Sequence, residues 1–258
     1  MSKLKGKKAK VMALVAVAAF GALAIQSATA QVVKSGNIEI EIEGGFSPKK
    51  LPKKGKAPIT LNVEGSMATT DKTHVPAVKT IFLEFDRNGE LNTKGLDSCT
   101  VGKLQSTLTA QAKAACPKAL VGQGRVTAEI ALPEQAPFSA SGPLLIFNGS
   151  QGNKQKLIFH VYANVPAPTT VVTTAIIGKG KGPYGTSANV AVPSITSGQG
   201  SLTSFKAKLA KTWSASGKKQ NLLLAGCPSG SLKARGDLSF VNGTKLTGNI
   251  VKPCTPGK

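Results

Sequence analysis

Strict alternation of apolar and polar residues constrains this chain more than any other feature. Ile38-Glu39-Ile40-Glu41-Ile42 sets three isoleucines on one face of an extended segment and two glutamates on the other, which is typical of a half-buried β-strand. Similar short runs, rich in Val, Ile, Thr, Leu and Phe, recur along the chain between Gly, Pro and Asn-Gly turns. They lie at residues 58–63, 81–85, 124–132, 143–147, 157–163, 170–177, 188–192 and 202–213.

This succession of strands predicts a mostly β protein. Strands with one apolar face must bury that face, so we expect an antiparallel β-sandwich, Ig-like or jelly-roll-like. A small disulfide-tied helical insertion at about residues 100–115 is expected to interrupt it. Because no long linker divides residues 31–258, a single domain is expected; the alternative is a division into two domains near residue 120.

The hairpin around Asn242-Gly243 allows two registers. A two-residue turn would set Phe240 opposite Lys245 and mix the apolar and polar faces. A three-residue loop, with the glycine in the left-handed conformation, would pair Leu238 with Leu246 instead. Since a buried face fixes the register of a strand, we expect the three-residue loop.

The first thirty residues have the pattern of a secretory signal peptide. A basic region between Lys3 and Lys10 precedes an apolar run from Val11 to Ile25 and a small-residue cleavage site, Ala28-Thr29-Ala30. The apolar run is shorter than the roughly 20 residues that span a bilayer, so cleavage is expected rather than retention as a membrane anchor. We therefore predict a secreted protein, extracellular or associated with the cell envelope, with no membrane span after cleavage.

The four cysteines predict two disulfides, because thiols are oxidised outside the cytoplasm. Three pairings are possible, and nearness in sequence favours Cys99 with Cys116 and Cys227 with Cys254. One continuous helix between the first two cysteines would hold its ends roughly 24 Å apart, whereas bridged Cα atoms lie within about 7 Å. The first pairing therefore requires two short helices folded back on one another.

Charge points to anionic partners. The net charge is +21, and without the five lysines of the predicted signal it is still +16, a field that attracts envelope polymers, acidic polysaccharide, lipid headgroups or nucleic acid. The densest group of cations lies between prolines and consists of Lys49, Lys50, Lys53, Lys54 and Lys56. This group is the predicted binding site for an anionic cell-wall polymer or polysaccharide; the alternative is a solvated connector between strands. Specific nucleic-acid binding is not expected, because no aromatic residues interleave with these lysines.

Residues that could support catalysis are sparse. His160 lies in an apolar run and is interpreted as a structural strand histidine, whereas His74 lies in a loop close to Asp71. The chain has no Gly-x-Ser-x-Gly elbow and no CxxC pair, so we expect no catalytic residues, no metal and no cofactor. The rival hypothesis is a secreted hydrolase acting on an extracellular polymer, and His74 hydrogen-bonded to Asp71 beside a hydroxyl would favour it.

Several stretches of the chain resemble a group of uncharacterised secreted bacterial proteins that are rich in β-structure. The matching stretches are Phe46–Pro52, Ile81–Asp86, Gly95–Cys99, Ala114–Gly124, Phe147–Gly149, Tyr184–Thr186 and Val192–Ile195. The resemblance extends over most of the chain after residue 30, and these stretches consist of turn and core residues. The family has no established activity, so the resemblance implies a shared architecture and no catalytic residue. Together these observations predict a non-catalytic, secreted protein that binds anionic envelope polymers through a lysine-rich face.

Overall fold

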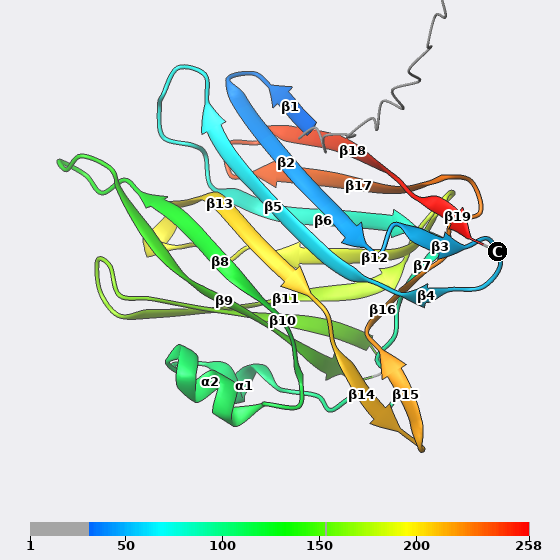
Figure 1. Ribbon diagram of the computed structural model, residues 1–258. Coiled ribbons are helices and arrows are strands. Elements are labelled where there is room, and N and C mark those ends of the chain that lie inside the picture. The colour runs from blue at the N-terminus through cyan, green and yellow to red at the C-terminus, as the bar shows by residue number, and fades with distance from the viewer. Residues whose placement is uncertain (1–30, 153, 258) are drawn as a thin grey trace, which may run out of the picture.

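Strands dominate the computed structural model, which describes residues 31–152 and 154–257 (Figure 1). The predicted signal peptide, residues 1–30, lies outside the described residues. The first strands are β1 (Gln31–Ser35), β2 (Ile38–Ser47), β3 (Lys50–Pro52), β4 (Ala57–Pro58), β5 (Thr60–Thr69), β6 (Val78–Asp86) and β7 (Gly89–Leu91). The helices α1 (Val101–Leu104) and α2 (Thr109–Ala115) follow.

The second half of the chain continues in the same way. Its first strands are β8 (Leu120–Ile130), β9 (Phe138–Gln151), β10 (Lys154–Ala163), β11 (Thr169–Lys179) and β12 (Tyr184–Ala191). A short 3₁₀ helix, η1 (Thr196–Gly198), precedes β13 (Gly200–Leu209), β14 (Thr212–Ala215) and β15 (Lys218–Asn221). The last strands are β16 (Leu223–Ala225), β17 (Ser231–Phe240), β18 (Lys245–Pro253) and β19 (Thr255–Gly257).

Twelve strands form one large antiparallel sheet in the order β1-β2-β5-β13-β8-β9-β10-β11-β12-β6-β17-β18. The two end strands, β1 and β18, lie in contact, so the sheet is nearly closed. Strands that are distant in sequence are neighbours at β5–β13 and at β12–β6. Three small sheets, β14–β15, β4–β16–β7 and the parallel pair β3–β19, extend from it.

The large sheet differs in layout from the expected sandwich. An Ig-like or jelly-roll-like sandwich packs two sheets face to face, whereas here the pairing runs through twelve strands without a division. The difference has a physical reason: alternation shows which face of a strand is buried but not which strand lies beside it. The mostly β, antiparallel character is confirmed.

The last hairpin adopts the predicted register. Leu238 lies opposite Leu246, and Gly243 has a φ of 87°, which is the left-handed conformation that a three-residue loop requires. Both leucines are buried in a core that also contains Ile38 and Phe240. Burial of one face therefore determined the register, as expected.

The central parts of β9 and β10 are buried on both faces, because the helices cover these strands from outside (Figure 1). On β9, Leu145 and Phe147 pack with Leu104 of α1 and Ala112 of α2, whereas the alternate residues of β9 belong to the core on the other face. The apolar residues are therefore consecutive at 144–147, as in other strands covered on both sides.

The Cys99–Cys116 disulfide closes the segment that contains the helices. Its Cα atoms are 5.7 Å apart, and the chain between them turns back between α1 and α2. Cys99 is 1% exposed and packs against the same cluster as the helices. Within the described residues, no helix has the length and apolar character needed to cross a membrane.

Candidate functional site

The lysine segment, residues 49–56, crosses one end of the large sheet between β2 and β4 (Figure 1). Leu51, near its centre, is 1% exposed and packs beside the Cys227–Cys254 disulfide. The carbonyl oxygen of Lys49 accepts a hydrogen bond of 2.8 Å from the backbone of Thr255, next to the β3–β19 pair. A buried leucine and a strand pair thus fix the backbone, while all five lysines are exposed residues.

Most of these lysines have no acidic partner. The exception is Lys56, whose Nζ lies 2.9 Å from a carboxylate oxygen of Glu90. Within the described part of the chain, no ion pair is formed by Lys49, Lys50, Lys53 or Lys54. The segment therefore presents a group of uncompensated positive charges.

A sixth lysine joins this group from another strand. Lys49 Nζ lies 4.2 Å from the centroid of the Phe46 ring, and partial burial, followed by the positive charge of Lys252, lowers the pKa of Lys49. Lys252 belongs to β18. The sequence analysis missed it because no local pattern indicates that the end of β18 approaches residue 49.

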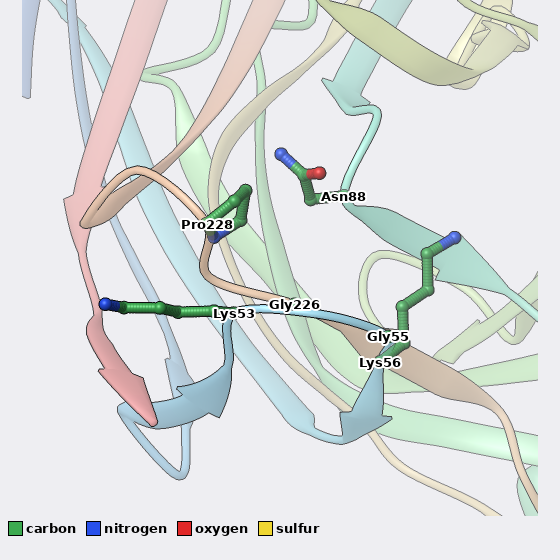
Figure 2. Close-up of a pocket in the computed structure, with 6 residues that line it drawn as sticks. All are labelled: Lys53, Gly55, Lys56, Asn88, Gly226 and Pro228. Carbon is green, nitrogen blue, oxygen red and sulfur yellow. The ribbon is translucent and has the colours of Figure 1, made fainter. Parts of the chain in front are cut away.

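Two shallow hollows flank Lys53. The first has a volume of about 200 Å³ and is lined by Lys53, Gly55, Lys56, Asn88, Gly226 and Pro228. Figure 2 shows the two lysine side chains extending to opposite sides, with Asn88 and Pro228 between them. The second, of about 350 Å³, is lined by Lys53, Lys54, Pro256 and Gly257. An extended ligand could therefore lie across this surface and meet several cations in succession.

The Cys227–Cys254 disulfide joins the two ends of the last hairpin next to the lysine segment. Its Cα atoms are 6.1 Å apart, so both pairings that sequence nearness favours are present. The backbone N–H of Cys227 also donates a 2.8 Å hydrogen bond to the carbonyl oxygen of Pro52. These links restrict how far the lysines can move apart.

At another place in the fold, His74 meets two polar side chains. Its Nδ1 lies 2.6 Å from Oε1 of Glu129, and its Nε2 lies 3.1 Å from Oγ of Ser201. Glu129 and Ser201 face each other directly on β8 and β13. Ser201 is 1% exposed, whereas the side chains of His74 and Glu129 are 28% and 33% exposed.

Asp71, the carboxylate that lies nearest to His74 in sequence, has a different role. Thr73 Oγ1 donates to it at 2.7 Å and Asn37 Nδ2 at 2.9 Å. These hydrogen bonds, that of Thr73 most of all, hold the pKa of Asp71 well below its ordinary value. Asp71 therefore closes a turn, and the carboxylate beside His74 is Glu129. Sequence reasoning missed Glu129 and Ser201 because they lie 55 and 127 positions from the histidine.

His160 is fully buried beneath the helices. Its Nε2 donates to the carbonyl oxygen of Thr107 at 3.0 Å, and the hydroxyl of the same threonine lies 3.1 Å away. Burial lowers the pKa of His160, so its ring is favoured in the neutral form. The ring thus anchors the turn between α1 and α2 to β10.

Comparison of the chain with protein-family models, with curated proteins and with solved structures finds no significant match. Within residues 31–152 and 154–257, no three His, Cys, Asp or Glu side chains gather closely enough to hold a metal ion. Two polar sites are therefore the candidates for function: the lysine segment and the group formed by His74, Glu129 and Ser201.

Proposed function

We propose that this protein is a secreted binding protein of the cell envelope or extracellular space, and that its lysine segment binds anionic polymers such as acidic cell-wall polymers or polysaccharides. The observation that carries the proposal is the absence of acidic partners around Lys49, Lys50, Lys53 and Lys54 within the described residues.

The fixed backbone strengthens this argument. A buried leucine, the β3–β19 pair and the nearby disulfide hold like charges close together, and the pKa of Lys49 is lowered first by partial burial and then by the nearby charge of Lys252. Such repulsion costs free energy in the unbound protein, and a polyanion lying across the segment would relieve it. The shallow hollows suit an extended polymer better than a small enclosed ligand.

Secretion is part of the proposal. The basic and apolar regions before Gln31 have the order of a signal peptide. Two disulfides suit an oxidising compartment, where small thiol reductants do not reverse them. Membership in the uncharacterised secreted bacterial family that the sequence resembles is proposed on the same grounds.

The test is retention of the purified protein on isolated envelope polymers at two salt concentrations. We expect retention at low ionic strength and release as salt rises from about 0.05 to 0.5 M, because salt screens exposed charges. Retention that does not change with salt, or no retention at all, would contradict the proposal.

A pair of charge-matched variants separates the contribution of the lysine segment to binding from the contribution of the net charge. Lys53→Gln/Lys54→Gln removes two charges from the segment, and Lys218→Gln/Lys219→Gln removes two exposed charges from β15. We expect the first variant to elute at clearly lower salt than the second. Equal shifts would show that binding follows total charge and that the lysine segment has no special role.

A further inference from the structure

A second site lies far from the lysine segment. The lysine segment follows Ser47 at one end of β2, whereas His74 follows Thr69, which pairs with Ile38 at the other end. A ten-residue strand spans about 30 Å. The two sites are therefore separated by about the length of β2.

Hydrogen bonds link Ser201, His74 and Glu129 in that order. The same order joins a nucleophile, a base and an orienting carboxylate in a catalytic triad. In the neutral tautomer that donates from Nδ1 to Glu129 at 2.6 Å, Nε2 is the acceptor for the hydroxyl of Ser201 at 3.1 Å. This chain of contacts is the arrangement that activates a serine for attack on a carbonyl carbon.

The fold assembles these three groups from rigid neighbours. Glu129 and Ser201 are a directly opposed pair in adjacent strands, so their backbones have a fixed separation. His74 is held by its own loop: Val75 next to it is 4% exposed, and the hydroxyl of Thr69 donates to the carbonyl oxygen of Thr73 at 2.5 Å. The contacts therefore do not depend on a single mobile side chain.

The backbone just before Ser201 is strained. Thr196, Ser197 and Gly198 have φ values of 49°, 54° and 96° in succession. For a β-branched residue such as threonine this region is costly, and strained backbone of this kind gathers at functional sites.

We propose that Ser201, His74 and Glu129 form a catalytic triad that hydrolyses esters of small acyl groups. Ser201 Oγ bonds to the acyl carbon as His74 Nε2 takes its proton; the alcohol then leaves with that proton. Water attacks the acyl-serine in the same way, the acid is released and the hydroxyl is restored. Glu129 orients the ring and stabilises its positive charge.

The low exposure of Ser201 restricts the substrate. Ser201 is 1% exposed, whereas the side chains of His74 and Glu129 are 28% and 33% exposed, so the proposal confines the substrate to a small acyl group such as acetyl that approaches from the side of the ring.

Covalent labelling of the wild-type protein tests the proposal directly. We expect a small fluorophosphonate to form one adduct, on Ser201, that peptide mass spectrometry locates. Ser139 is the matched control, because it lies opposite Glu129 on the neighbouring strand and is exposed. If accessibility alone decided labelling, Ser139 would react, whereas an activated hydroxyl would make Ser201 react. An adduct on Ser139 alone, or none on either serine, would overturn the proposal.

Variants and turnover complete the test. We expect His74→Gln to slow labelling at least about 100-fold, which is the contribution of a general base, and Glu129→Gln to slow it about tenfold or more. Hydrolysis of p-nitrophenyl acetate should be lost in Ser201→Ala and kept in Ser139→Ala. Wild-type protein that is unfolded in urea before the reagent is added should form no adduct. This control uses no variant, so it tests whether labelling needs the folded site even if a variant fails to fold. Labelling of Ser201 that persists in His74→Gln or in urea would refute the triad.

Discussion

The two disulfides close two regions of very different character. The helix region, residues 99–116, lies over β9 and β10 and contributes buried apolar side chains to the core. The lysine region, which combines the lysine segment with the Cys227–Cys254 disulfide, directs its cations into solvent. The first crosslink lies in the core beneath two helices, and the second lies in a small apolar cluster beside exposed like charges. The difference teaches that a buried disulfide can support a packed core in one region and a charged surface in another.

The largest expected difference between the regions is in how much stability is lost when a buried phenylalanine is truncated. Phe147, below the helices, is fully buried, whereas Phe46, below Lys49, is 7% exposed. We expect Phe147→Ala to lower the free energy of unfolding by about 3–5 kcal/mol and Phe46→Ala to lower it by less, because the ring of Phe46 lies closer to the surface. Urea unfolding followed by circular dichroism measures both. Equal losses would show that the lysine region depends on its core as much as the helix region does.

Removing each disulfide should separate stability from binding. The chain-entropy model gives a loss of about 3 kcal/mol for Cys99→Ala/Cys116→Ala and about 3.5 kcal/mol for Cys227→Ala/Cys254→Ala, from loops of 17 and 27 residues. Only the second variant should also elute from an anionic polymer at lower salt, because that disulfide packs against Leu51 and its loss loosens the backbone beneath the lysines. If both variants keep wild-type elution, the fixed spacing of the lysines is not needed for binding.

Acid should weaken the helix region through His160. Its pKa is lowered in the folded protein, so below about pH 6.5 the unfolded chain binds a proton that the folded protein does not, and stability falls as pH falls. The slope is at most about 1.4 kcal/mol per pH unit for one proton. Denaturant unfolding between pH 7.5 and 5 should show this slope in wild type and a flatter one in His160→Gln. Thr107→Val, which keeps the ring, should retain the slope; equal slopes in wild type and His160→Gln would contradict the assignment.

The smallest effect is expected at the one ion pair of the lysine segment. Glu90→Gln removes the partner of Lys56, and the free energy of unfolding should change by less than about 1 kcal/mol because the pair is partly exposed. Elution from the polymer should nevertheless move to higher salt, since one more lysine becomes available. A shift to lower salt would show that the pair positions the segment rather than reducing its charge.

Local patterns predicted the parts of this molecule that depend on near neighbours. The Leu238–Leu246 register follows from burial and turn chemistry, and the disulfides follow from the spacing of four cysteines in a chain with a signal-like start. The closure of twelve strands into one sheet does not follow, because alternation carries no information on which strand neighbours which. Glu129 and Ser201 were missed for the same reason: they become neighbours only once β8 pairs with β13.

The position of β13 sets the order in which the sheet can be completed. This strand lies between β5 and β8, yet it begins at Gly200, 80 residues after β8 begins at Leu120. Until it arrives during synthesis, both neighbours present an unpaired edge, which is the kind of edge that recruits strands from other chains. A chain that stops before residue 200 would keep those edges permanently. We expect such a chain to aggregate. The fold is therefore reached only if β5 and β8 avoid other chains until β13 has been synthesised and can pair with both.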